Sequence, residues 1–428
     1  MRRNVLHVYA MSALLGLLTG TVGSCLMLAI QKLTALISQL FEVLDAKGWP
    51  IGLLSALLSM LMVYSAWLLV KWVATDASGS GVQEIEGALL HKRPVRWRRV
   101  LPIKFFGGIL SISSQLVVGR EGPTIQIGGN LGQMLGEWFQ LPRHHVDALI
   151  AAGAAAGLAT AFNAPLAGIL FVLEEMRSQF HFSFTNFTAV TVCCVVAVIV
   201  LHLLVGAGPA IPMAVFSLPS LPSLGLFFIF GLLVGGVGLL FNLVLMKSLA
   251  QIDKLGPKTR DGYVLLIGLM VGFLAYLKPE MVGGGYAIIE RSLTMSPSLS
   301  LLVLLVIVRF ITTMLSYSTG APGGIFAPML ALGTLLGLAA SHGLNFILSD
   351  TTVHPQMFAV AGMGALFAAV VRAPVTGIVL VVEMTQNYAL ILPLMVTCLT
   401  ATTVVQLAGN QPIYTQLLHR TLNKEVTR

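Results

Sequence analysis

Long apolar stretches without a charged residue recur along the whole chain. A helix needs about 20 apolar residues to cross the hydrocarbon core of a membrane, and several of these stretches could hold one helix or two. Together they predict roughly ten or more membrane helices, many of them interrupted by Gly and Pro. Backbone at that depth must satisfy its own hydrogen bonds, which excludes an open sheet. The stretches are Val8–Gln31, Ile51–Val70, Ala148–Leu173, Phe182–Met246, Phe310–Ser349 and Met384–Leu418.

Composition agrees with this prediction. Only 10% of the 428 residues are charged and 56% are hydrophobic, whereas soluble domains carry about 25% charged residues. Too few charges remain to cover the surface of a soluble protein of this size. We therefore expect an all-α, polytopic membrane protein that forms a single transmembrane domain over residues 1–428.

The net charge of +8 does not indicate a nucleic-acid partner, because much of the positive charge lies in one short segment. Six basic residues and no acidic residue fall between His91 and Lys104. In a membrane protein, a short loop of this kind is typical of the cytoplasmic side. The six residues are Lys92, Arg93, Arg96, Arg98, Arg99 and Lys104.

Three pairs of motifs indicate an internal repeat. The GxxxP element at 119–123 recurs at 324–328, Asn163-Ala-Pro is echoed by Arg372-Ala-Pro, and Gly79-Ser-Gly81 is weakly matched by Gly283-Gly-Gly285. The pairs follow in the same order at nearly constant spacing, so we expect two related halves at about 1–215 and 216–428.

The two halves also differ in their positive charge. The counterpart of the basic loop, near 295–309, contains only Arg309. If positive loops stay inside, the halves face opposite ways, as in the inverted repeats of many transporters. Such repeats place a binding site near the midplane, where broken helices meet.

The glycine turns at 79–83, 119–123 and 324–328 predict an anion site. Each interrupts or borders an apolar segment and precedes helix-compatible sequence. A helix that starts after such a turn presents unpaired N–H groups and the positive end of its dipole. Several such ends together would bind an anion without a full positive charge. A buried Lys or Arg would hold the anion too tightly for release.

Other chemistries lack their motifs. The chain has no GxxxxGK[ST] and no HExxH, and its nine histidines are scattered, so we expect no nucleotide loop and no metal site. An intramembrane enzyme that uses Glu121 would need a second catalytic group and a nucleophile or metal. No such constellation is present in the sequence, so we do not expect an enzyme.

Four acidic residues lie in otherwise apolar segments, where carboxylates are costly and often functional. Glu121 lies inside a glycine turn, where its carboxylate could occupy the anion site and leave it on protonation; the alternative is a carboxylate that caps a helix. One of Glu174 and Glu175 could simply pair with Arg177, and the sequence does not choose between them. Glu383 stands at the repeat position of Glu174 and could cap or pair in the same way.

These motifs resemble those of the CLC family of chloride channels and chloride/proton antiporters, particularly its bacterial antiporter branch. The resemblance spans nearly the whole chain and includes Gly153-Ala-Ala-Ala-Gly157, Phe162-Asn-Ala-Pro165 and Asn387-Tyr388. Its three main signatures are Gly79-Ser80-Gly81-Val82-Gln83, Gly119-Arg120-Glu121-Gly122-Pro123 and Gly324-Ile325-Phe326-Ala327-Pro328.

The resemblance implies a CLC-type inverted repeat with broken and tilted helices, in a homodimer whose subunits each hold a pathway through the lipid of a bacterial plasma (inner) membrane. It implies that chloride is bound by the hydroxyls of Ser80 and Tyr388 and by the backbone N–H groups of Ile325 and Phe326. It also implies that Glu121 is an external gate and Glu175 an internal proton acceptor. No cofactor is implied beyond the chloride and protons that are transported.

The expected function is therefore secondary active exchange of chloride for protons, and the alternative is a passive chloride channel. Plain channels of the family usually lack the internal acid, which favours exchange. One position departs from the family, since Gln83 replaces a proline that presets the start of a helix; we expect a looser turn there. The chain stops soon after its last predicted helix, so we expect no cytoplasmic nucleotide-binding domains.

Overall fold

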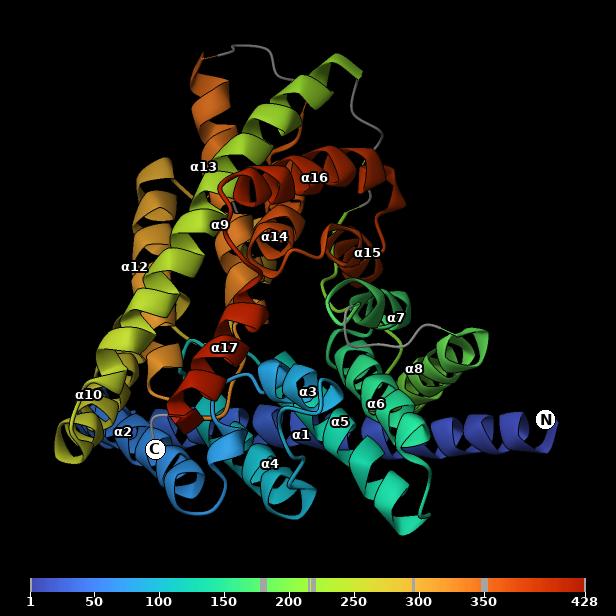
Figure 1. Cartoon of the computed structure of the whole chain (residues 1–428). Helices are drawn as coiled ribbons and strands as arrows, with labels where there is room; N and C mark the ends of the chain where they lie inside the picture. Colours follow the sequence, from blue (N-terminus) through green and yellow to red (C-terminus); the bar gives the residue numbers. More distant parts are fainter. Residues whose placement is uncertain are drawn as a thin grey trace.

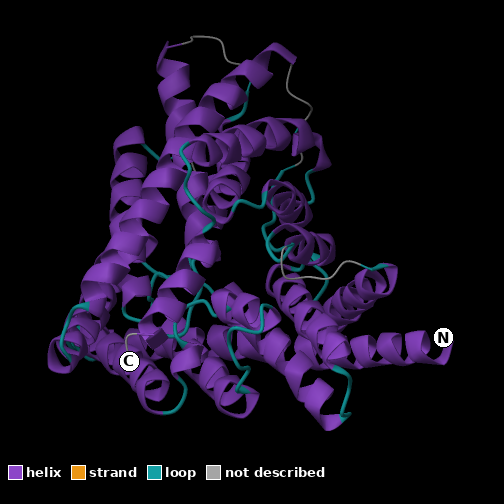
Figure 2. Cartoon of the chain, in the orientation of Figure 1, coloured by secondary structure: helices purple, strands orange, loops and turns teal. Residues whose placement is uncertain are grey.

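The computed structural model describes residues 2–177, 183–214, 216, 221–294, 297–347 and 353–426. Within these ranges the regular structure is helical, and the only β contacts are two isolated bridges between turns (Figure 2). The predicted all-α class is confirmed. The α-helices are α1 (Arg2–Asp45), α2 (Ile51–Trp72), α3 (Val82–Leu89), α4 (Trp97–Ser113), α5 (Glu121–Trp138), α6 (Arg143–Phe162), α7 (Pro165–Glu174), α8 (Phe184–Leu204), α9 (Leu224–Asp253), α10 (Pro257–Leu277), α11 (Tyr286–Thr294), α12 (Leu299–Ser318), α13 (Phe326–Ile347), α14 (Pro355–Val371), α15 (Pro374–Thr385), α16 (Ile391–Leu407) and α17 (Ile413–Val426). Short 3-10 helices occupy η1 (Thr75–Ala77), η2 (Leu221–Ser223), η3 (Pro279–Met281) and η4 (Tyr388–Leu390).

Nine helices in the described ranges are long and apolar enough to cross a membrane, and α7, α14 and α15 are apolar but shorter. The nine long and three shorter apolar helices agree with the expectation of roughly ten or more membrane helices. Some of the long apolar stretches hold one long helix and one short helix. In the stretch Ala148–Leu173, for example, α6 ends at Phe162 and the short α7 begins at Pro165. The chain is a multi-spanning membrane protein with broken helices.

The break between α6 and α7 has the same local cause as the break between α14 and α15. Asn163 and Arg372 each adopt a left-handed conformation after the last helical residue, with φ of 55° and 68°, which stops the helix. An alanine follows, and Pro165 or Pro374 then occupies the first turn of the next helix, where its missing N–H costs no hydrogen bond. The repeated Ala-Pro motif is thus a helix stop followed by a helix start.

Helices from the two halves meet at several places (Figure 1). The short helices α7 and α15 pack against each other, α10 packs on α2, and the C-terminal helix α17 returns to contact α3 near the start of the chain. These contacts join segments from both halves of the chain.

Close glycine crossings hold helices of each half together. A Cβ on Gly128 of α5 would overlap the carbonyl of Gly153 in α6, and one on Gly333 of α13 would overlap the carbonyl of Gly362 in α14. Small residues let membrane helices approach closely, where van der Waals packing drives association. The two crossings occupy matching positions in the repeat.

We predict that Gly333→Ala destabilises the protein, because the added methyl group must push apart two backbones that have no room to give. Overpacking of this kind typically costs about 1–3 kcal/mol. Thermal unfolding in detergent measures the loss. Gly236→Ala is the matched control, since Gly236 lies in α9 with no atom near its Cβ position; an equal loss in both variants would contradict the packing argument.

Candidate functional site

The three glycine turns come together, as the sequence predicted. Gly119 and Gly324 exchange two backbone hydrogen bonds, each 2.7 Å from N to O. The N–H of Gly323 also donates to the carbonyl of Gly79 at 2.9 Å. These hydrogen bonds hold three turns at one point. Two of the turns come from the first half of the chain and one comes from the second half.

The helices α3, α5 and α13 all begin at this junction. The first hydrogen bond of α13 runs from Met329 N to Ile325 O at 3.0 Å, so the N–H groups of Phe326 and Ala327 have no partner within the helix. Gly122 lies directly against Ser80, because a Cβ at Gly122 would meet the Ser80 hydroxyl. The positive ends of three helix dipoles therefore face a common region.

Two buried hydroxyl groups complete the arrangement. Ser80 and Tyr414 are both fully buried, their side chains lie within interaction range of each other, and neither Ser80 Oγ nor Tyr414 OH has a hydrogen-bond partner in the described protein. Buried hydroxyls without partners are costly, and an anion between them would accept from both.

The structure does not bring Tyr388 to the site. Its side chain is 68% exposed in η4, at the start of the segment that leads into α16. The tyrosine that lies at the junction is Tyr414, whose ring stacks on Phe326 with centroids 5.6 Å apart. The sequence did carry a signal for this residue. Ile413, Tyr414, Leu417 and Leu418 are buried on α17, with the spacing of one apolar helix face.

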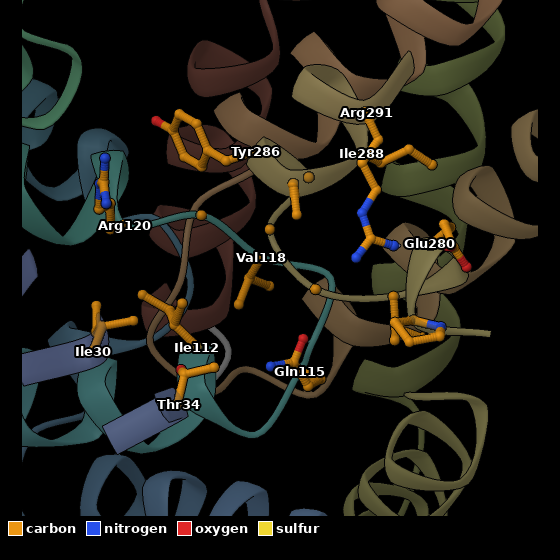
Figure 3. A pocket seen from close by; sticks show the side chains of 17 residues that line it. Ile30, Thr34, Ile112, Gln115, Val118, Arg120, Glu280, Tyr286, Ile288 and Arg291 are labelled. Atoms are coloured by element: carbon orange, nitrogen blue, oxygen red, sulfur yellow. Dashed lines mark hydrogen bonds and ion pairs between the residues drawn. The ribbon is translucent and has the colours of Figure 1, made fainter. Parts of the chain in front are cut away.

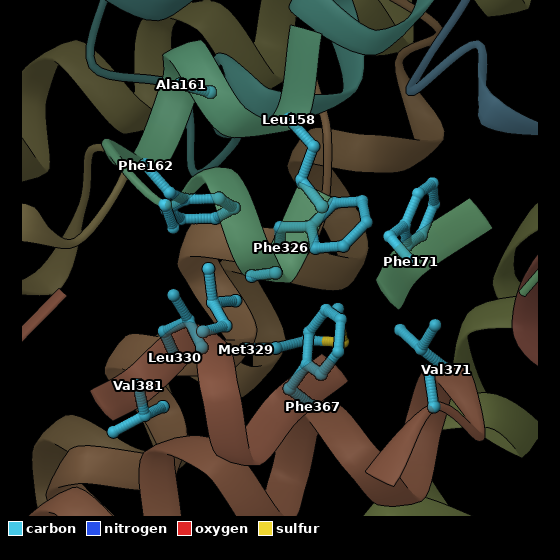
Figure 4. Packing of buried hydrophobic residues seen from close by; sticks show 14 of the residues in the cluster. Leu158, Ala161, Phe162, Phe171, Phe326, Met329, Leu330, Phe367, Val371 and Val381 are labelled. Atoms are coloured by element: carbon cyan, nitrogen blue, oxygen red, sulfur yellow. The ribbon is translucent and has the colours of Figure 1, made fainter. Parts of the chain in front are cut away.

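Phe326 lies at the centre of an aromatic cluster (Figure 4). Its ring contacts Phe162, Phe171 and Phe367 with centroid distances of 6.3, 6.0 and 5.2 Å. These residues come from α6, α7 and α14. The packing fixes the first residue of α13, and with it the direction of the unpaired N–H groups.

Glu121 is fully buried and its carboxylate lies at the start of α13. The carboxylate and the Cβ of Ala327 are the groups nearest to Gly119, and the backbone N–H of Ala327 faces the carboxylate. Oε1 accepts a hydrogen bond from the hydroxyl of Tyr286 at 2.7 Å, while Oε2 has no hydrogen-bond partner in the described protein. The carboxylate thus occupies a place where an anion could bind. Sequence reasoning did not identify Tyr286.

Two buried cations hold the glycine turns without pointing into the site. Lys104 donates to the carbonyls of Ala77 and Gly79 at 3.1 and 2.7 Å. Arg309 donates to the carbonyls of Glu280, Val282 and Gly283 at 2.8–2.9 Å. The two residues occupy matching positions in the repeat, on α4 and α12.

The predicted basic loop therefore needs correction. Lys104 is buried in the middle of α4, and Arg93 is buried in ion pairs with Asp76 and Glu84 at 3.0 and 2.8 Å. Four of the six basic residues remain exposed, and they are Lys92, Arg96, Arg98 and Arg99. These four still mark one end of α4 as the basic end.

Gln83 lies at the second position of α3 and is buried. The helix starts at Val82, after Gly81 in a left-handed conformation with φ of 85°. The neighbouring Gly79 carbonyl accepts from both Lys104 and Gly323. The start of the helix is thus retained without proline, and the effect of Gln83 on the rigidity of the turn stays a prediction.

Hydrogen bonding distinguishes Glu174 from Glu175. Glu174 accepts from the backbone N–H groups of Val375 and Thr376 at 3.0 and 2.6 Å, and so caps α15. Glu383 accepts from Leu166 and Ala167 at 3.0 and 2.8 Å, and so caps α7. The expectation that Glu383 is a cap is confirmed. Glu174, at the end of α7, caps α15, and Glu383, on α15, caps α7.

Glu175 is not used in this way. It is buried beside Glu86 of α3, close enough for their carboxyl groups to interact. Two carboxyl groups in contact can share one proton, because like charges repel. Sequence reasoning missed Glu86, since α3 carries other polar residues and did not stand out as an apolar segment.

These features define a membrane protein in which glycine turns, helix starts and buried hydroxyls meet between broken helices. Residues 61–406 match the family model described as voltage gated chloride channel. The H(+)/Cl(-) exchange transporters ClcA of Vibrio parahaemolyticus and Vibrio campbellii are 46% and 44% identical to the chain, covering 98% of it and 91% of each relative. The crystal structure of a slow cyanobacterial Cl-/H+ antiporter matches with a TM-score of 0.94 at 41% identity, covering 97% of this chain and 98% of that one. The chain belongs to the voltage-gated chloride channel, or CLC, family.

We predict that Glu174→Ala lowers stability, because it leaves the N–H groups of Val375 and Thr376 and the Thr376 hydroxyl without their acceptor. Thr376 is buried, and a buried donor left unsatisfied costs about 1–3 kcal/mol. Thermal unfolding in detergent checks this. Glu175→Gln is the comparison, since its carboxyl group caps no helix; a larger loss there than in Glu174→Ala would contradict the assignment.

Proposed function

We propose that the protein is a secondary active transporter that exchanges chloride for protons across a membrane. The observation that carries the proposal is the pair of buried hydroxyls of Ser80 and Tyr414 at the junction where α3, α5 and α13 begin, neither of which has a hydrogen-bond partner among the described residues. Neutral donors of this kind bind an anion and still release it. The names of the relatives, which are chloride/proton exchange transporters, support the choice of ions.

In this proposal, the central chloride is held by the hydroxyls of Ser80 and Tyr414 and by the backbone N–H groups of Ile325 and Phe326. Tyr414 replaces the earlier candidate Tyr388, whose exposed side chain lies outside the site. The stack of Tyr414 on Phe326 orients the hydroxyl, and the aromatic cluster around Phe326 excludes water from one side. The protein needs no cofactor for this step.

Protons enter and leave through two carboxyl groups. Glu121 is the external gate, because its carboxylate competes with chloride for the N-terminus of α13 and withdraws when it takes a proton. Glu175 is the internal acceptor, and Glu86 beside it helps to hold the proton. Since both proton sites adjoin the chloride path, movement of one ion depends on the other.

The wider assembly follows the family resemblance. The halves 1–215 and 216–428 form an inverted repeat within one transmembrane domain, supported by the reciprocal caps of α7 and α15 and by the matching roles of Lys104 and Arg309. Two copies form a homodimer in a bacterial plasma membrane. The basic end of α4 lies in the cytoplasm.

We predict that liposomes containing the protein move protons when a chloride gradient is imposed. Glu121→Gln abolishes proton movement but leaves chloride flux, because the amide cannot carry a proton. Glu175→Gln likewise removes proton movement. Paired recordings of external pH and chloride efflux measure both ions in one preparation.

Three outcomes would contradict this prediction. Robust chloride flux without proton movement in the unmodified protein would favour a passive channel. Coupling that survives Glu121→Gln would refute its role as a gate. Loss of proton movement in Glu174→Gln but not in Glu175→Gln would show that the internal proton acceptor is Glu174 and not Glu175.

We predict that Tyr414→Phe weakens chloride binding several-fold, since one hydrogen bond contributes about 1 kcal/mol. The ring and its stack on Phe326 remain, so only the hydroxyl is lost. Isothermal titration with sodium chloride measures the affinity. Tyr388→Phe, which removes an exposed hydroxyl, leaves the affinity unchanged; the reverse result would restore Tyr388 to the site.

A further inference from the structure

Tyr286 is the only described side chain that donates a hydrogen bond to the carboxylate of Glu121. The distance from its hydroxyl to Oε1 is 2.7 Å. Tyr286 is the first residue of α11 and directly follows the glycine run Gly283–Gly285. A hydrogen bond to a carboxylate in a buried setting is among the stronger kinds. Any movement that takes the Glu121 carboxylate away from the Tyr286 hydroxyl must break this bond.

The ring of Tyr286 is itself held in place. The guanidinium of Arg120 lies over the ring, 4.7 Å from its centroid, and also donates to the carbonyl of Ala161 at 3.3 Å. A cation over an aromatic face is attracted by the ring quadrupole. Figure 3 shows Tyr286 and Arg120 next to each other at one side of a pocket. The ring is therefore oriented by the residue adjacent to Glu121 in the sequence.

The backbone that carries Tyr286 is anchored as well. Arg309 binds the carbonyls of Val282 and Gly283, each at 2.8 Å, and the N–H of Gly283 donates to the carbonyl of Gln115 at 2.9 Å. The turn before α11 is thus tied to α12 and to the segment after α4. Because this turn is fixed, Tyr286 cannot follow a carboxylate that moves away.

Tyr286 and Arg120 line a cavity of about 240 Å³ together with Gly119, Glu280 and Arg291. Ile112 at the end of α4 and Gln115 beyond it also line the cavity, which therefore lies at the end of α4 opposite its basic end. If the basic end faces the cytoplasm, the cavity belongs to the outer side. Tyr286 thus stands between Glu121 and the outer approach to the site.

We propose that Tyr286 is a positioning residue that latches the Glu121 gate in its closed place and so limits the rate of exchange. The proposal rests on the proposed function of Glu121. Release of the carboxylate requires loss of the Tyr286 hydrogen bond, so the latch adds to the barrier for opening. The hydroxyl carries no transported proton, and the ratio of protons to chloride is set elsewhere.

The test is Tyr286→Phe, which removes the hydroxyl and keeps the ring beneath Arg120. In liposomes, chloride turnover rises by about tenfold, as expected for loss of one hydrogen bond to a charged group. The proton-to-chloride ratio stays as in the unmodified protein. Tyr263→Phe is the matched control, because it removes a part-buried hydroxyl that donates to the carbonyl of Leu315 at 2.9 Å, and it leaves the turnover unchanged.

A second measurement separates a latch from a structural role. In a Glu121→Ala background there is no carboxylate to hold, so adding Tyr286→Phe produces no further change in chloride flux. If Tyr286→Phe does not fold, Tyr286→Leu removes the same hydroxyl and is used in its place.

Three results would overturn the latch. Unchanged or slower turnover in Tyr286→Phe would show that the hydrogen bond does not restrain the gate. A faster rate that persists in the Glu121→Ala background would show that the hydroxyl merely narrows the path. Loss of proton coupling would make Tyr286 a proton carrier. Failure of the proposed function is distinct, since the unmodified protein would then show no coupled exchange.

Discussion

The reciprocal hydrogen bonds between Gly119 and Gly324 are the constraint on which the rest of the site depends. They join one glycine turn from each half, so the starts of α5 and α13 must face the same point. Only glycine fits here, because a side chain at Gly119 would displace the Glu121 carboxylate and one at Gly324 would meet the backbone of Gly122. Ser80 is brought to the same place by the bond between Gly323 and Gly79.

Two buried cations, Lys104 and Arg309, bind the turns near this point, but their side chains do not point into the site. Lys104 and Arg309 are fully buried, and their donors are directed to the carbonyls of the turns that precede α3 and α11. Burying a cation is tolerable when it is hydrogen-bonded, and the hydrogen bonds of Lys104 and Arg309 stiffen the turns. The anion is left to neutral hydroxyls and backbone N–H groups, which bind weakly enough to release it. Glu121 can compete for these donors for the same reason.

The acidic residues show how one residue type takes different roles by position. Glu174 and Glu383 use both oxygens to cap the short helices α15 and α7, which joins the halves a second time. Glu175 is one residue away and caps nothing, so its carboxyl group remains for Glu86. Sequence reasoning could pair Glu174 with Glu383 through the repeat, and the family resemblance singled out Glu175. Only the hydrogen bonds showed that Glu174 is a helix cap.

The sequence by itself determined the membrane environment, the all-helical class, the repeat and the glycine turns that meet at the site. These depend on local properties, namely runs of apolar residues and the conformations open to Gly and Pro, which the chain displays without being folded. Sequence reasoning placed Tyr388 rather than Tyr414 at the site and overlooked Glu86 and Tyr286. The positions of these residues depend on contacts between distant segments. Tyr414 reaches Ser80 only when α17 returns to α3 in the first half. Tyr286 meets Glu121 only when α11 lies beside the start of α5. Tertiary structure alone decided those contacts, since no local pattern records which distant residue will lie opposite.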